Sequence, residues 1–249
     1  MKRFLIFIII LCLTNPFTNA QLWKMKRYEA SAGLGSSMAF GDVGGFSRDE
    51  NILGLRDLSF LQTRFNFNLS LKYRILDDFN ARLSLSYGLL HFTDQRGSNE
   101  NRGYEASTSI FEPAILGEYY FIKNKTENLY TFYKGQKSIF RGIFSSFDLY
   151  AFTGIGGLSY KVNGNDKLEN SGNMNTGGFT AVIPAGAGIV LIFTPDFNFG
   201  LEIGRRFLFS DFLDGYTTQY SGSKDVYYFF NVTMTYMLKT GRNGLPSFR

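Results

Sequence analysis

Two long runs of alternating apolar and polar residues constrain the fold of this chain more than any other feature. In the first run, from Arg64 to Ile75, Phe, Leu, Tyr and Ile take every second position, and Arg, Asn, Ser and Lys take the others. After Asp77-Asp78 the alternation resumes and continues from Phe79 to Leu89. A period of two indicates extended strands with one apolar and one polar face. The short aspartate connection predicts a β-hairpin.

The length of these runs favours a membrane barrel over a soluble one. Each run holds about 11 or 12 residues, whereas strands of soluble proteins usually hold about 5–6. A tilted strand needs roughly 9–11 residues to cross a bilayer. Strands that are apolar on one side and charged on the other suit a barrel with a lipid-facing exterior and a polar interior. A soluble sandwich or lipocalin-type barrel would place the aromatic residues inside and use shorter strands.

The N-terminus has the features of a secretory signal peptide. A basic start at Lys2-Arg3 precedes an apolar run from Phe4 to Leu13, and small residues end at Ala20. Cys12 lies inside the apolar run after Leu11, so it does not fit a lipoprotein site. We therefore expect a leader over residues 1–20 and a mature chain without cysteine, which excludes disulfides and thiolate metal sites.

Composition agrees with a barrel and argues against nucleic-acid binding. Aromatic residues make up 17% of the chain, as expected for interfacial girdles. Removal of Lys2 and Arg3 with the leader lowers the formal charge from +5 to +3, which is too mild to indicate a nucleic-acid partner. No later segment is long and apolar enough for a membrane helix.

Alternation and turn residues predict about eight antiparallel strands. The predicted strands run over 27–40, 64–75, 79–91, 109–121, 147–160, 180–193, 197–209 and 226–238. Tight turns follow the second and sixth strands, and long polar loops, including 94–103, 161–178 and 210–225, follow the odd ones. This asymmetry is typical of outer-membrane up-and-down barrels. The expected domains are the leader 1–20, an outer-membrane barrel over 21–238 and a periplasmic tail over 239–249.

Ionised residues gather on the inward face of the predicted strands. They are Arg27, Glu29, Arg64, Lys72, Arg74, Arg82, Glu112, Glu118, Glu202 and Arg206. An eight-stranded barrel has room for side chains and little else, so we interpret this set as a paired charge network that fills a plugged interior. A selective pore is the alternative, and it would need a wider barrel.

The connection after the fourth strand is long and basic, unlike the other turns expected on its side of the membrane. Its candidate partner-docking residues are Lys123, Lys125, Lys134, Lys137 and Arg141. The segment contains a single acidic residue, Glu127. A small hairpin around Lys134-Gly135-Gln136 fits this segment. We expect it to dock a periplasmic partner; binding to anionic headgroups, or simple solvation, is the alternative.

Candidate catalytic chemistry is sparse. His91, the single histidine, lies near the predicted outer rim, and Ser98, Ser109 and Asp94 are within plausible reach for a lipid-modifying enzyme. No nucleophile motif marks any of these residues. The sequence also lacks a histidine or cysteine cluster for a metal. We therefore predict no enzymatic activity, no cofactor, no metal and no small-molecule substrate.

Three segments resemble the PorG-like outer-membrane barrels of Bacteroidetes. The first strand closes on Gly33-Leu34-Gly35-Ser36-Ser37-Met38-Ala39-Phe40-Gly41-Asp42, similar to the family's G-x-S-x-x-x-G-D segment. Residues 202–215, from Glu202-Ile203-Gly204 to Leu213-Asp214-Gly215, resemble its E-x-G-x-R … S-D-Y-L-D segment, with Phe212 in place of the usual Tyr. The third is 152–160. The family-like loop residues are Gly41, Asp42, Ser210, Asp211, Leu213 and Asp214.

The resemblance implies a component of the type IX protein secretion system, tied to gliding motility in some members. Such barrels are thought to anchor periplasmic ring proteins to the outer membrane, and they offer no catalytic residues to carry over. The expected partners are therefore outer-membrane lipid and periplasmic secretion-ring proteins. Two alternatives stay open: a small OmpA/OmpX-like barrel or adhesin that acts through its outer loops, and a lipid-modifying enzyme that uses His91.

Overall fold

The computed structural model describes residues 26–44, 62–96, 99–123, 147–172, 174–194, 196–217, 224–241 and 245–247. The predicted leader, most of the first loop (45–61) and nearly all of the basic connection lie outside these ranges. None of the helices in the described ranges is long and apolar enough to cross a membrane.

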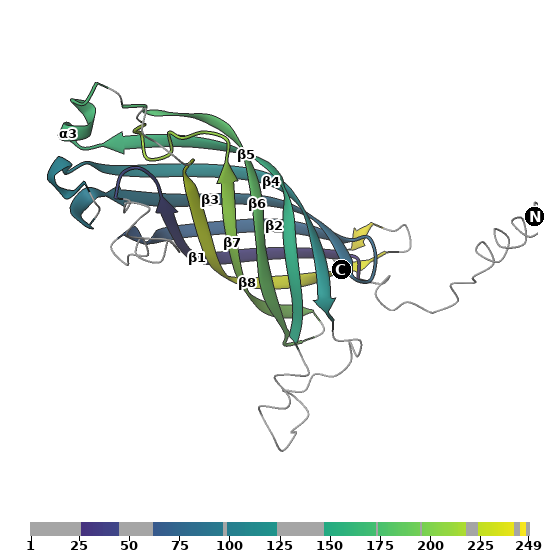
Figure 1. The fold of residues 1–249 in the computed structure, drawn as a ribbon. Coiled ribbons are helices and arrows are strands. Elements are labelled where there is room, and N and C mark those ends of the chain that lie inside the picture. Colours follow the sequence, from purple (N-terminus) through teal and green to yellow (C-terminus); the bar gives the residue numbers. More distant parts are fainter. Residues whose placement is uncertain are drawn as a thin grey trace, which may run out of the picture.

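Eight long antiparallel strands form a closed barrel, which confirms the predicted fold class (Figure 1). Each strand pairs with its sequence neighbour, and β1 pairs with β8 to close the sheet. The barrel strands are β1 (Tyr28–Phe40), β2 (Arg64–Arg74), β3 (Phe79–Thr93), β4 (Glu105–Ile122), β5 (Phe147–Gly164), β6 (Gly177–Ile192), β7 (Phe197–Leu208) and β8 (Val226–Thr240).

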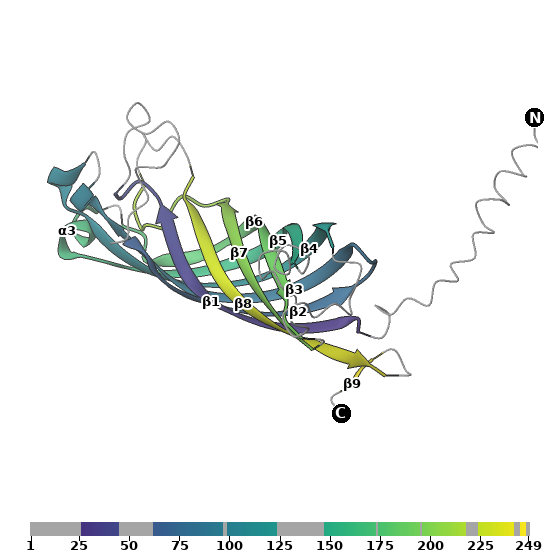
Figure 2. The ribbon, with the colours of Figure 1, turned by 90° about the horizontal axis from the view of Figure 1, so that it is seen from below.

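The two ends of the barrel differ. We call the end with the β2–β3 and β6–β7 turns the turn end and the opposite end the loop end. At the loop end lie two short 3-10 helices, η4 (Asp94–Arg96) and η5 (Glu100–Arg102), and the helix α3 (Asp166–Glu169). At the turn end β9 (Pro246–Ser247) pairs with the last residues of β8, so part of the predicted tail continues the sheet outside the barrel (Figure 2).

The sidedness of the strands follows their alternation. Outward residues of the long hairpin are exposed, among them Leu69 at 46% and Leu83 at 51%. The inward residues Lys72 and Arg82 of the same hairpin are only 5% and 3% exposed. The directly paired residues Leu69 and Leu85 lie on the same outer face. The predicted apolar exterior is therefore present, and so is a polar interior around Lys72 and Arg82.

The structure corrects the bounds of one predicted loop and of one predicted strand. The segment 161–178 was expected to be a loop, but β5 continues to Gly164, α3 follows, and β6 already begins at Gly177. β4 likewise begins at Glu105, four residues before its predicted start at Ser109. The strands β4, β5 and β6 therefore extend the barrel wall at the loop end. The polar composition of these strand ends led to their assignment as loop.

Candidate functional site

The interior of the barrel holds a continuous ionic network near its middle. The Nζ of Lys72 lies 3.0 Å from Oε1 of Glu118, and Nη1 of Arg82 lies 3.0 Å from the same oxygen. Arg82 also contacts Glu202 through Nη1 and Nη2 of its guanidinium group, at 2.5 and 3.3 Å. The hydroxyl of Tyr150 donates to Glu202 at 2.7 Å. Since buried charges are tolerated only when paired, these contacts explain how five strands place polar groups in one bore.

Two smaller clusters extend this network in opposite directions. Toward the turn end, Nη2 of Arg74 lies 3.1 Å from Oε1 of Glu29. Toward the loop end, Nε of Arg206 lies 3.5 Å from Glu112, whose carboxylate also accepts a hydrogen bond from the hydroxyl of Tyr227. Arg206 stacks on the ring of Phe229, with its guanidinium carbon 4.3 Å from the centroid.

The predicted inward set divides into a buried group and two peripheral residues. Eight of its members are buried inside the barrel: Glu29, Lys72, Arg74, Arg82, Glu112, Glu118, Glu202 and Arg206. Arg27 and Arg64 are half-buried near the strand ends, where they donate to the hydroxyl of Tyr73 and to the carbonyl of Thr63. These two arginines therefore do not join the buried clusters.

Apolar side chains fill the half of the barrel toward the loop end, which the prediction of a polar interior missed. Leu90, Phe92, Ile110, Tyr227 and Phe229 all lie in one buried cluster and are at most 1% exposed. A signal was present in the sequence, because alternation stops where Leu89 and Leu90 are consecutive and where Tyr227 to Phe230 are all aromatic. Consecutive apolar residues indicate a strand with apolar surroundings on both faces, which here are the outer wall and the buried cluster.

Residues 209–217, which we call the mouth segment, fold into the barrel at the loop end. The predicted loop over 210–225 is a loop in its described part, 210–217, but Leu213 and Asp214 within it are fully buried, which its polar composition did not indicate. The hydroxyl of Thr108 on β4 donates to the carbonyl of Leu213 at 2.7 Å. The amide of Leu213 donates to Asp225 at 2.8 Å.

The mouth segment brings together residues of the two family-like loop motifs. The amide of Val43, next to Asp42, donates to Asp214 at 2.9 Å across 171 positions of sequence. A Cβ placed on Gly41 would lie 2.7 Å from carboxylate oxygens of both Asp214 and Asp225. Glycine at position 41 is therefore required by the close approach of two carboxylates to the backbone.

The remaining motif residues line the same region. The carbonyl of Asp42 accepts a hydrogen bond from Arg102 at 2.9 Å. The hydroxyl of Ser210 lies 3.3 Å from that of Tyr160, and Asp211 accepts from Thr217 at 3.0 Å. The motifs thus act together in closing the mouth.

Asp94 is a second organising residue of the mouth that the sequence did not reveal. It is fully buried and accepts from Nε and Nη2 of Arg102 at 2.8 and 2.9 Å, and from the amides of Gly44 and Tyr104 at 2.9 and 3.0 Å. The prediction of a solvated loop over 94–103 is therefore wrong for Asp94. The polar composition of residues 94–103 could not reveal that the Asp94 carboxylate accepts hydrogen bonds from buried amides.

Burial also perturbs the acids of the mouth. It raises the pKa of Asp214 to about 7, because the carboxylate has lost its hydration. It raises the pKa of Asp225 well above the ordinary value, and the charge of Asp214 adds to that shift. Asp42 and Asp211 lie near enough to contribute in the same direction.

His91 lies at the rim with partners other than the predicted ones. Its Nδ1 is 3.2 Å from the hydroxyl of Ser107, and its Nε2 is 3.2 Å from Glu105. Asp94 is engaged with Arg102, and Ser98 lies outside the described residues. Because Ser107 is the direct cross-strand neighbour of His91, the cluster also has a simple structural origin in strand register.

The basic connection is described only at its first residue. The Nζ of Lys123 contacts the carbonyl of Asp77 and lies 3.1 Å from its carboxylate, so this lysine joins β4 to the β2–β3 turn. Lys125, Lys134, Lys137, Arg141 and the expected small hairpin lie outside the described residues. In the described part of the chain, no three His, Cys, Asp or Glu side chains are grouped to hold a metal.

Comparison with known proteins gave structural matches alone. No family model and no curated protein sequence matches the chain. Neisserial surface protein A is 8% identical, with 84% of this chain and 96% of that chain covered and a TM-score of 0.45. Ail of Yersinia pestis is 12% identical over 85% and 98%, with a TM-score of 0.44. E. coli outer membrane protein W is 15% identical over 85% and 97%, with a TM-score of 0.39.

Because these identities and TM-scores are low, the fold assignment rests on the closed strand pairing of the chain itself. A closed barrel of eight antiparallel strands, with apolar side chains outside and charged ones inside, is the architecture of small outer-membrane barrels.

Proposed function

We propose that this chain is an integral outer-membrane barrel that serves as a non-enzymatic anchor for a periplasmic assembly. More specifically, we propose the role implied by the PorG-like resemblance: attachment of periplasmic ring proteins of a type IX secretion system, tied to gliding motility in some relatives. The observation that supports membrane insertion is the apolar exterior of the barrel. Exposure of such a large apolar surface to water would be unfavourable.

Two belts of aromatic residues support insertion in a bilayer. Toward the turn end, outward pairs include Tyr28 with Tyr73, 5.1 Å between ring centroids, and Phe197 with Tyr236, 4.8 Å. Toward the loop end, Phe40 packs edge-on against Tyr228 at 5.5 Å. Exposed aliphatic residues lie between them along the strands, such as Val232 between Tyr228 and Tyr236 on β8, and Ile115 on β4. Aromatic girdles around an aliphatic band are typical of barrels that span a membrane.

The closed interior favours an anchoring role over a conducting one. The charge network occupies the middle of the bore, and the apolar cluster and mouth segment occupy the half above it. A barrel sealed in this way offers partners its ends and its outer wall. Purified protein in planar bilayers should show no stable open conductance; a steady, ion-selective conductance would contradict the sealed interior.

The basic connection after β4 supports a partner at the turn end. β4 ends at Ile122 and β5 begins at Phe147, both at the end opposite to the mouth, and the basic residues lie between them in sequence. An acidic surface on the periplasmic partner would complement this charge. The leader expected over 1–20 would direct the chain to the periplasm, from which the barrel inserts.

Charge reversal tests the anchoring proposal. The variant Lys134→Glu/Lys137→Glu/Arg141→Glu should insert normally but recover far less of the ring proteins when purified from native membranes in mild detergent. The matched control Lys161→Glu/Lys167→Glu changes two exposed cations at the loop end and should recover the ring unchanged. Full recovery with the triple variant would reject docking through this connection.

A small adhesin-like barrel is the second candidate, favoured by the extended loop end. There β4, β5 and β6 rise into an ordered rim that carries α3. If this rim binds an extracellular ligand, the purification should bring down no periplasmic ring protein from native membranes. That outcome would replace the anchor with the adhesin.

A further inference from the structure

The lipid-facing wall carries one unexpected cation. Arg205 on β7 is exposed on the outer face, between Ile203 and Phe207, which are exposed by 54% and 42%. The other charged residues at outward strand positions in the described ranges, Glu105 and Lys161, lie near the loop-end termini of β4 and β5.

Arg205 lies closer to the apolar band than those residues do. It is eight positions from Phe197 in the turn-end girdle, roughly 26 Å along a strand. Phe207 and Phe209 lie beyond it toward the loop end. A guanidinium at this depth is costly unless it reaches the interface or a counter-ion.

The side chain of Arg205 leans toward the interface. Its guanidinium carbon lies 4.6 Å from the ring centroid of Phe207 and 5.7 Å from that of Tyr228 on β8. On the β6 side its direct neighbour is Ala185, whose small side chain leaves the guanidinium uncovered. Among the described residues, no carboxylate lies within ion-pairing distance of Arg205, so none of them balances its charge.

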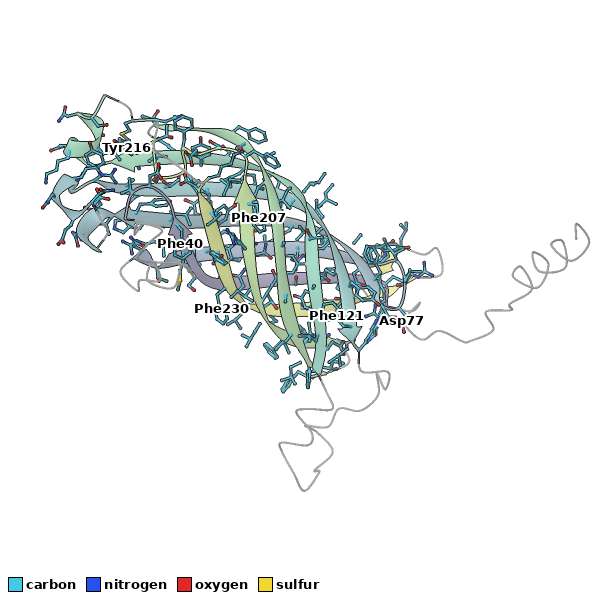
Figure 3. All side chains as sticks on the ribbon, in the orientation of Figure 1. Phe40, Asp77, Phe121, Phe207, Tyr216 and Phe230 are labelled. Carbon is cyan, nitrogen blue, oxygen red and sulfur yellow. The ribbon has the colours of Figure 1, made fainter. Side chains whose placement is uncertain are left out.

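A second cation lies above the first on the same wall. The Nζ of Lys224 lies 5.3 Å from the ring centroid of Phe209. Since Tyr228 pairs with Arg205 and Val226 with Phe207, Lys224 lies two cross-strand pairs beyond Arg205, about 13 Å along the strands. Figure 3 shows Phe207 on the wall between the mouth, marked by Tyr216, and the turn end, marked by Phe121 and Asp77.

We propose that Arg205 and Lys224 bind the phosphate groups of an outer-leaflet lipid whose headgroup carries two separated phosphates. The arginine fork suits a phosphate in a bidentate contact, the lysine acts as a point charge, and Phe207, Phe209 and Tyr228 contact the acyl chains or sugar. The site rests on the membrane location proposed above, because only an inserted barrel presents this wall to lipid.

The test uses the full-length protein purified from membranes in a zwitterionic detergent and titrated with diphosphorylated lipid A. The readout is the temperature at which the folded, faster-migrating gel band is lost. Lipid A should raise this temperature for the wild type. The variant Arg205→Gln/Lys224→Gln should need roughly tenfold more lipid A for the half-maximal shift, because charge-assisted contacts are lost.

Matched controls separate the site from general charge attraction. Lys161→Gln/Lys167→Gln removes the same charge from the loop end and should titrate like the wild type. Equal titration of the Arg205/Lys224 variant and the wild type, or an equal loss in the control variant, would overturn the site. Both variants alter exposed side chains, so their melting temperatures without lipid should match the wild type.

Two further arms identify the source of the phosphate. Dephosphorylated lipid A should give a much smaller shift; an undiminished shift would show that acyl chains alone suffice and overturn the proposal. Inorganic pyrophosphate should give none; a shift that the Arg205/Lys224 variant abolishes would assign the site to a soluble anion instead. If the wild type is absent from the outer-membrane fraction, both the proposed function and the site are rejected. If the wild type is in that fraction but lipid A shifts the wild type and the Arg205/Lys224 variant equally, the site alone is rejected.

Discussion

Arg82 on β3 and Glu202 on β7 are four strands apart around an eight-stranded barrel, yet their side chains meet at 2.5 Å across the bore. Arg82 also binds Glu118, which in turn binds Lys72 on β2. One guanidinium thus connects opposite walls of the barrel, and it serves two carboxylates that would otherwise be buried with fewer partners.

We predict that Arg82→Gln is more destabilising than Glu202→Gln. Loss of the arginine leaves Glu202 with Tyr150 and Glu118 with Lys72, and uncompensated buried charge costs about 3–5 kcal/mol. The double variant Arg82→Gln/Glu202→Gln removes both charges and should recover part of the loss. Urea unfolding of the refolded barrel in vesicles measures the effect. A double variant as unstable as the sum of both single variants would argue against direct coupling.

Gly41→Ala should loosen the mouth. The added Cβ would lie 2.7 Å from oxygens of Asp214 and Asp225, whose carboxylates already accept from Val43 and Leu213. Displacing them should cost about 1–3 kcal/mol and expose the mouth segment to protease. Gly241→Ala is the matched control, because its nearest atom lies 3.5 Å away. Equal cleavage of the two variants would contradict the close approach at Gly41.

The mouth should be more stable at pH 5 than at pH 8. An unfolded aspartate titrates near 3.9, whereas burial raises the pKa of Asp214 to about 7 and that of Asp225 in the same direction. Between these values the folded chain holds more protons than the unfolded one, so stability is present at low pH and falls as pH rises through about 7.

Protection factors of the Val43 and Leu213 amides, which correct each exchange rate for its intrinsic dependence on pH, measure this effect, since both amides donate to these acids. Asp225→Asn imitates a protonated carboxyl and should reduce the difference in protection between pH 5 and pH 8. The same difference in the variant, or lower protection at pH 5 than at pH 8 in the wild type, would show that the pair does not titrate as described.

His91→Ala should leave membrane lipid composition unchanged. The imidazole is 10% exposed and lies between its cross-strand neighbour Ser107 and Glu105, which leaves little access for a substrate. Lipid analysis of cells that carry His91→Ala or Ser107→Ala, beside the wild type, checks this expectation. A loss of the same lipid product in both variants would make the enzyme the better function.

The fold was predictable because lipid and bore impose opposite demands on alternate residues. Leu83 lies on the outer face and Ser84 in the bore, so the alternation of residue types indicates where the strand runs, how long it is and which face points outward. The prediction weakened where apolar residues occupy both faces of a strand, as at Leu89 and Leu90 or Phe229 and Phe230, because alternation then disappears.

The mouth was harder to predict, because the sequence does not show whether an aspartate is hydrated or accepts hydrogen bonds from buried amides. Asp94 and Asp225 lie in polar segments that resemble solvated loops, yet both accept backbone hydrogen bonds out of water. Gly41, Asp42 and Asp214 were noticed through family resemblance, and the contact between their segments across the barrel mouth gives a physical reason for those motifs.

Depth-dependent quenching by brominated lipid tests the sidedness of the barrel most directly. A fluorophore is attached to single cysteines at Leu83, Leu85, Lys167 and Glu169 in a mature chain that we expect to lack cysteine. Strong quenching at Leu83 and Leu85, on the apolar face, and weak quenching at Lys167 and Glu169, which are exposed at the loop end, is the predicted result. Weak quenching at Leu83 and Leu85, or equal quenching at all four positions, would contradict a barrel whose apolar face meets lipid.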